Sequence, residues 1–169
     1  MPRFRVLPER SKVWIESRSN LHPVHAEGDQ VVGFVEAEVS GDRLLLDPPP
    51  RGRIEVPVER LRSGNALYDG ELLRRIDARR YPTIVGEIRE VRTTDRPDRY
   101  RVVGDLSFHG VTRTVEGEVT VQVQDDRLVV EGEQTFDVRD FGIEPPRILF
   151  LRVYPDVKVR LRVEAIREG

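Results

Sequence analysis

The stretch GDLSFHGVTRTVEG, residues 104–117, contains two runs of alternating apolar and polar residues that meet at His109 and Gly110. Such alternation is typical of strands that have one face on a core and one in water. Glycine adopts positive φ freely, and histidine does so more readily than most residues, so the two can form a tight turn. The sequence therefore predicts a hairpin in which His109 is a turn residue. Its largely apolar side pairs Phe108 with Val111, Leu106 with Arg113, Gly104 with Val115 and Val102 with Gly117.

The segments around this hairpin continue the same pattern. A second turn centred on Asp125 and Asp126 extends the hairpin into a three-stranded antiparallel meander. Its register pairs Val123 with Leu128, Val121 with Val130, Val119 with Gly132 and Val115 with Phe136. Alternating runs give eight predicted strands, namely KVWIE near the N-terminus, residues 31–39, 53–58, 83–91, 99–108, 111–124 and 127–138, and DVKVRLRVEA at 156–165. Closure of such a sheet into a barrel removes its exposed edges, so we expect an all-β antiparallel barrel.

One connection departs from the strand pattern. In residues 60–82, Leu72, Leu73 and Ile76 recur at helical spacing. We expect one short helix there, with Asp69 as its N-cap and Pro82 as its stop signal. The chain has 169 residues and no internal repeat, so it is expected to form a single domain over residues 1–169.

Composition narrows the classes of function. The chain has 28 basic and 30 acidic residues without charge blocks, which disfavours nucleic acid and anionic membrane surfaces as partners. It has no cysteine, which excludes disulfides and thiolate catalysis. The first residues contain no apolar signal-peptide core, and no apolar run is long enough to span a bilayer. We therefore expect a cytoplasmic protein that is not stably inserted in a membrane.

A few side chains invite a chemical interpretation. In HPVH, His22 and His25 could be metal ligands, but extended backbone does not bring them together as a helical pair would, so we expect no metal site. Arg113 lies on the inward phase and could hold a polar head group, or extend to solvent. Tyr68 and Tyr81 could place hydroxyls at a cavity mouth, or pack the helix on the barrel. No nucleophile motif is present, and no cofactor or catalytic residue is expected.

Glycines recur on the apolar phase of the predicted strands. Glycine weakens a strand interior, so its presence there needs a reason. One reason is curvature, because glycines let strands bend as a barrel closes. The other is space, because missing side chains leave an apolar cavity. Both interpretations apply to Gly33, Gly86, Gly104, Gly117 and Gly132.

Several segments taken together resemble the YceI-like family. They are SGNALYDGELLRRIDARRYPTI at 63–84, YRVVGDLSFHGVTRTVEGEV at 100–119, FDVRDFGI at 136–143 and the last alternating strand VKVRLRVEA. The resemblance covers about residues 11–166. It implies an eight-stranded lipocalin-like barrel that holds a long isoprenoid or similar lipid, and it implies no catalytic residue.

The positions that match the family's apolar lining in phase become the candidate ligand-binding residues. These are Ile54, Val56, Ile84, Val102, Leu106, Phe108, Val119 and Phe136, with Leu72, Leu73 and Ile76 on the covering helix, and with Gly104, Gly117 and Arg113 beside them. The leading hypothesis is a non-enzymatic carrier or sequestering protein for an apolar chain such as a polyisoprenoid or an isoprenoid quinone. The alternatives are a scaffold protein with a filled barrel and an enzyme acting on a small apolar substrate. The sequence leaves open whether the chain forms a homodimer.

Overall fold

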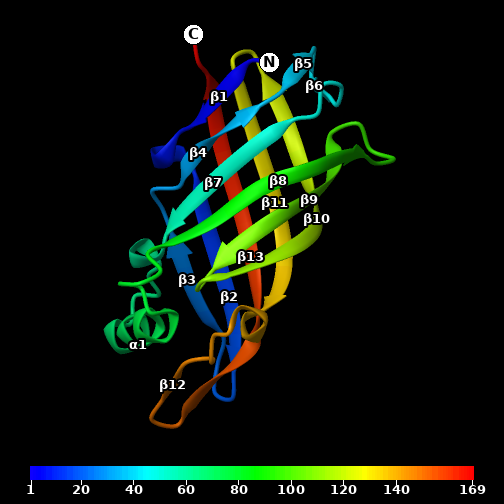
Figure 1. Cartoon of the computed structure of the whole chain (residues 1–169). Helices are drawn as coiled ribbons and strands as arrows, with labels where there is room; N and C mark the ends of the chain where they lie inside the picture. Colours follow the sequence, from blue (N-terminus) through cyan, green and yellow to red (C-terminus); the bar gives the residue numbers. More distant parts are fainter.

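Eight antiparallel strands close into a barrel in the computed structural model, which describes residues 1–169 (Figure 1). The predicted fold class, an eight-stranded antiparallel barrel with one helix, is confirmed. In order around the ring the strands are β1 (Arg3–Val6), β4 (Val32–Glu36), β7 (Arg51–Pro57), β8 (Thr83–Thr93), β9 (Arg99–Phe108), β10 (Val111–Gln124), β11 (Arg127–Asp137) and β13 (Leu151–Arg167), which returns to β1.

The long strand β13 has two partners on the same edge, one after the other along its length. β13 pairs with β1 at its C-terminal end and with β2 (Lys12–Ser19) along most of its remaining length, and β2 pairs with β3 (Val24–Gly28). The short helix η1 (Pro8–Arg10) separates β1 from β2. At this break the buried Ser11 hydroxyl donates to the Leu7 carbonyl at 2.8 Å and accepts from the Glu164 amide at 3.1 Å. The second of these bonds gives the Glu164 amide a partner where the ladder is interrupted.

The central hairpin has the predicted register. Every predicted pair between β9 and β10 is present, from Phe108–Val111 to Val102–Gly117. His109 has φ 55° and Gly110 has φ 75°, which confirms both as turn residues. A Cβ at Gly110 would lie 2.8 Å from the Tyr81 ring, so the close approach of this ring also requires glycine.

The register of the following hairpin is correct only near its turn. β10 and β11 pair from Gln124–Arg127 to Val119–Gly132, as predicted, and the ladder then stops. The predicted pair of Val115 with Phe136 is therefore wrong. Beyond Gly132, β10 stays on β9 and β11 stays on β13, while η3 (Val138–Phe141) packs against all three of β10, β11 and β13.

The predicted helix is present, but its start is wrong. α1 (Ala66–Ile76) begins after Asn65, whose side-chain oxygen accepts from the Leu67 and Tyr68 amides at 3.0 and 3.1 Å. Asp69 instead lies inside the first turn and accepts from both the amide and the hydroxyl of Ser63. The helix ends at Asp77, which adopts a left-handed conformation with φ 56°, well before Pro82.

Replacing Asn65 with alanine is expected to lower the free energy of unfolding by about 1 kcal/mol, because two helix amides lose their acceptor. Urea denaturation followed by circular dichroism measures this loss. Asn65→Asp retains the acceptor and is the matched control. Equal stability of the alanine variant and the wild type would contradict the assigned cap.

The two ends of the barrel are covered differently (Figure 1). The upper end, where both termini lie, carries a hairpin of β5 (Glu38–Ser40) and β6 (Arg43–Leu45), and the Leu44 amide donates to the Tyr100 hydroxyl at 3.1 Å. The lower end carries α1, η3 and β12 (Arg147–Ile148), and η2 (Val58–Arg60) follows β7. No helix in the chain is long and apolar enough to cross a membrane.

Candidate functional site

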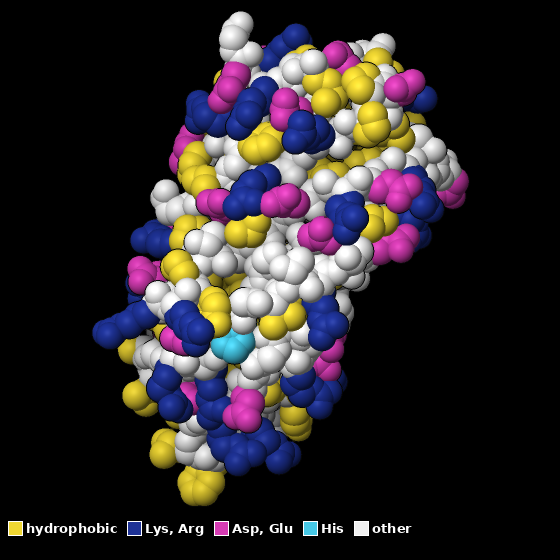
Figure 2. All heavy atoms as spheres, in the orientation of Figure 1, with side chains coloured by type: hydrophobic (Ala, Val, Ile, Leu, Met, Phe, Trp, Pro, Cys, Tyr) yellow, Lys and Arg dark blue, Asp and Glu magenta, His cyan; other side chains and the backbone are white.

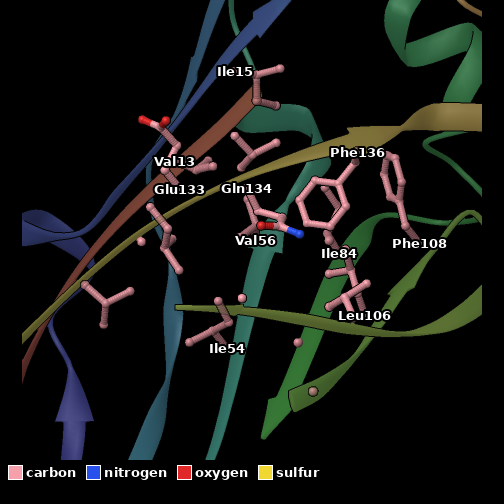
Figure 3. Close-up of a pocket in the computed structure, with 18 of the residues that line it drawn as sticks. Val13, Ile15, Ile54, Val56, Ile84, Leu106, Phe108, Glu133, Gln134 and Phe136 are labelled. Carbon is pink, nitrogen blue, oxygen red and sulfur yellow. The ribbon is translucent and has the colours of Figure 1, made fainter. Parts of the chain in front are cut away.

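An apolar cavity of about 430 Å³ occupies the barrel (Figure 3). Of the 50 residues that line it, 34 are hydrophobic, which is the composition expected of a site for an apolar ligand. The lining extends from Leu44 and Tyr100 near the upper end to Pro145 and Pro146 beside β12. The cavity is therefore elongated along the barrel, as a chain-like ligand requires.

Most of the candidate residues line this cavity. Figure 3 shows Ile84, Leu106 and Phe136 pointing toward one another from three different strands. Contact of these residues with a ligand stays a prediction. The candidates that line the cavity are Ile54, Val56, Leu72, Ile76, Ile84, Val102, Gly104, Leu106, Phe108, Gly117, Val119 and Phe136.

Two candidates do not line the cavity. Arg113 pairs with Leu106 in the expected register, but its exposed side chain extends to η3 and its Nε donates to the Asp140 carbonyl at 3.0 Å. Leu73 lies on the side of α1 that packs against the small core cluster under the barrel, which includes Phe141 and Ile143. Arg113 thus links two elements of the lower end, and Leu73 attaches the helix to them.

Polar side chains inside the cavity are few. Tyr68, from α1, and Ser17, from β2, both line it and both are buried. Burial raises the pKa of the Tyr68 hydroxyl, and the neighbouring Ser17 hydroxyl offsets part of that rise. Tyr68 is therefore neutral at physiological pH and can offer its hydroxyl to a polar end of a ligand. Tyr81 lies elsewhere, with its ring against His109 at a centroid distance of 5.1 Å.

Charged residues at the cavity wall are paired on the outer face. Lys158 contacts Glu133 at 3.3 Å, and Arg53 forms an ion pair with Glu87. Figure 3 shows the Glu133 carboxylate pointing away from Phe136. An unpaired charge in an apolar cavity would be costly, and this arrangement leaves none in the interior.

The inward glycines differ in what a side chain at their position would meet. A Cβ at Gly104 would lie 2.7 Å from the carbonyl oxygen of Glu87, and one at Gly33, where φ is 143°, would lie 2.0 Å from that of Arg53. These two glycines are required by backbone approach. At Gly86 a Cβ would be at an ordinary 3.4 Å from Ile54, so this glycine leaves space in the cavity. Close backbone approach and cavity space therefore explain different glycines.

The wall between β10 and β11 is incomplete toward the lower end. Below the last paired residues, Val119 and Gly132, the Gln134 side chain crosses the separation and its Nε2 donates to the Glu116 carbonyl at 3.1 Å. A Cβ at Gly117 would meet only the Gln134 amide, at 3.3 Å. A flexible side chain thus replaces ladder hydrogen bonds at this part of the wall.

The histidines do not meet at the cavity. His25 lies exposed on β3 opposite Glu16, and His22 lies exposed in the preceding turn, where its Nδ1 is 2.8 Å from the Pro23 carbonyl. No group of three His, Cys, Asp or Glu residues could hold a metal ion. His109 Nδ1 is 3.0 Å from the Phe141 carbonyl, so this turn residue also ties the central hairpin to η3.

Sequence reasoning missed a large part of the lining. Val13, Ile15 and Ser17 on β2 line the cavity, as do alternate residues of β13 from Val157 to Val163. Their alternation of apolar and polar residues indicates an inward face, whereas the candidate positions follow the resemblance to the family. Tyr100 lies two residues before Val102 on the same strand, so the same alternation predicts that it faces inward.

Comparison with known proteins now identifies the family. The model of the YceI-like domain matches residues 4–165. The chain belongs to the YceI-like family. A comparison with curated proteins gave no match.

Solved structures share the fold of this YceI-like chain. The chain is similar to Burkholderia cenocepacia BcnA, with 17% identity and a TM-score of 0.78 over 95% of this chain and 99% of that one. It is similar to a polyisoprenoid binding domain from Saccharophagus degradans implicated in plant cell wall breakdown, with 12% identity, a TM-score of 0.75 and 98% of each chain covered. The Campylobacter jejuni YCEI protein has 13% identity and a TM-score of 0.68 over 86% of this chain and 85% of that one. At these identities the likeness shows the fold alone.

Proposed function

We propose that this YceI-like protein binds a long apolar chain, a polyisoprenoid, an isoprenoid quinone or a similar lipid, and carries or sequesters it without chemical change. The observation that carries the proposal is the elongated apolar cavity with no interior charge. Each methylene removed from water contributes about 0.8 kcal/mol, so a dry cavity of matching shape is sufficient to hold a chain. Tyr68 and Ser17 offer hydroxyls to a single polar end at the lower part of the cavity.

The comparisons support the chemical class of this ligand. The Saccharophagus degradans relative is a polyisoprenoid binding domain, and its fold covers nearly the whole chain. We infer a ligand of the same class for this chain.

The two alternatives receive less support. A scaffold with a filled barrel would bury its inward side chains against one another, whereas a cavity of about 430 Å³ separates them. An enzyme would require titratable groups gathered at the cavity. Among the candidates for such a cluster only Tyr68 lines the cavity, while Arg113, Tyr81 and the histidines lie outside it.

Native mass spectrometry of protein purified without added lipid tests the proposal. We expect a mass above that of the chain, and we expect extraction with organic solvent to remove the excess and release an apolar molecule. Incubation of the extracted protein with a polyisoprenol should restore the excess mass. A chain-only mass before extraction, with no uptake afterwards, would contradict a carrier function.

A further inference from the structure

The most exposed large hydrophobic side chains gather at the lower end of the barrel, on three separate segments. Leu149 and Phe150, at the tip of the β12–β13 hairpin, are 89% and 88% exposed. Leu21 in the β2–β3 loop is 61% exposed, and Leu67 in the first turn of α1 is 69% exposed. Figure 2 shows hydrophobic side chains projecting at this end below a group of Lys and Arg residues. A clustered apolar surface of this kind marks an interaction site.

The hairpin tip is held firmly although its side chains are free. The Asn20 side chain donates to the Phe150 carbonyl at 2.9 Å and accepts from the Arg152 amide at 2.7 Å, which joins the hairpin to the β2–β3 loop. Ile148 and Leu151, on either side of the tip, pack on the cluster of Val24, Tyr68 and Val153. Exposure of Leu149 and Phe150 is therefore a feature of the folded hairpin and not of a loose loop.

Two features of this tip cost free energy when nothing is bound to it. Leu149 has φ 51°, a left-handed conformation in which a bulky side chain is strained and glycine or asparagine is normal. Arg147 and Arg152 are direct cross-strand partners, and like charges in that position repel. Nearby arginines are neutralised, as in Arg18–Asp156 at 2.8 Å, but no carboxylate lies within 4.0 Å of Arg147 or Arg152. An external anionic partner would relieve the repulsion between the two arginines, and an apolar one would cover the exposed side chains that the strained tip holds outward.

We propose that the lower end of the barrel, defined by Leu21, Leu67, Leu149, Phe150, Arg147 and Arg152, docks reversibly on an anionic lipid bilayer. The segment PPRILFLR, residues 145–152, places an apolar tip between two arginines and contains no acidic residue. Leucine and phenylalanine side chains insert at the boundary of the acyl chains, and flanking arginines extend back to lipid phosphates. Charge and shape therefore match a bilayer surface.

Docking at this end would serve the cavity directly. Pro145 and Pro146, which line the cavity, immediately precede the hairpin, so a docked barrel presents this end of its lining to the bilayer. This step alone rests on the proposed function, whereas docking itself does not require lipid in the cavity. The charge pattern of the whole chain disfavoured an anionic membrane surface as a partner, and the proposal departs from that expectation because the two arginines are a local feature.

Flotation with vesicles tests the docking surface. We expect the full chain to float with vesicles of phosphatidylglycerol and phosphatidylcholine, and to float less with phosphatidylcholine alone or at high salt. The double variant Leu149→Asn, Phe150→Ser should bind the anionic vesicles about tenfold more weakly or worse. It should keep the wild-type circular dichroism spectrum, since asparagine suits the backbone at residue 149. Arg147→Gln with Arg152→Gln should reduce anionic binding to the level of phosphatidylcholine alone.

Leu45→Ser, at the opposite end of the barrel and 43% exposed in the wild type, is the matched control and should float like the wild type. Equal flotation of the tip variant and the wild type, or no flotation of the wild type, overturns the proposal. A wild-type dimer on gel filtration that the tip variant abolishes, without flotation, assigns this surface to a second copy and also overturns it. Lipid retained by the tip variant in native mass spectra separates a failure of docking from a failure of carriage.

Discussion

Replacing Gly86 with valine is expected to reduce the lipid retained by the purified protein about tenfold or more, while the barrel stays folded. A Cβ at this position would make an ordinary contact with Ile54 at 3.4 Å, and the methyl groups beyond it would occupy cavity space. In an apolar pocket, a change of one methylene alters affinity about 10- to 200-fold. Valine also suits a strand better than glycine, so stability should be equal or higher. Native mass spectrometry and urea denaturation measure the two effects.

Gly104→Ala is the matched control, because Gly104 lies on the next strand and on the same inward face. Its Cβ would lie 2.7 Å from the Glu87 carbonyl oxygen, beside the bulge between Ile88 and Glu90. The backbone has to shift, and we expect a loss of about 1–3 kcal/mol in the free energy of unfolding. Wild-type lipid retention by the Gly86 variant would return Gly86 to the curvature interpretation. Wild-type stability of the Gly104 variant would contradict the backbone requirement there.

The barrel was predictable where one face of a strand is consistently apolar. Between β9 and β10, a shift of one residue would expose Leu106 and Phe108, so the alternation together with the His109–Gly110 turn determined the register. The pair Val115–Phe136 failed because nothing local indicates that β10 and β11 separate. Both strands contact η3, which is held under β10 by bonds from Arg113 and His109, residues distant from it in the sequence.

The helix start was predicted wrongly because the sequence offers two suitable N-cap residues. Asn65 and Asp69 both precede helical spacing and both are favoured N-cap residues. The position of Ser63, whose amide and hydroxyl bond Asp69, settles the choice and depends on the loop conformation. The two alternatives for Arg113 stayed open for a similar reason, because strand phase places its Cβ but not the end of a long side chain near a strand terminus.

The cavity itself could be predicted only as one of two interpretations. Apolar phase identified Ile84 and Phe136 as inward, yet the same phase is expected for a filled barrel. Whether glycine leaves space depends on the neighbouring backbone, which separates Gly86 from Gly104. The exposed tip at Leu149 and Phe150 was missed because a short apolar run normally indicates a buried strand.

Truncation of one side chain in each part should separate the packed part of the barrel from the hollow part. Phe4→Ala is expected to lower the free energy of unfolding by about 3–5 kcal/mol, because Phe4 is 1% exposed and belongs to the packed core. Leu106→Ala should cost no more than about half as much in lipid-free protein, since its half-buried side chain already faces a cavity that supplies no contacts on that side. Urea denaturation of extracted protein measures both.

Bound lipid should change only one of these two decreases in the free energy of unfolding. In loaded protein the cavity around Leu106 is filled, so Leu106→Ala also weakens binding and the stabilisation that binding supplies. Phe4 is not among the residues that line the cavity, so its loss should be the same with and without lipid. If the Leu106→Ala loss does not grow when a polyisoprenol is added, the chain does not lie against this wall. If both losses are equal in lipid-free protein, the barrel closes around a packed interior in solution, and the scaffold function becomes the better account.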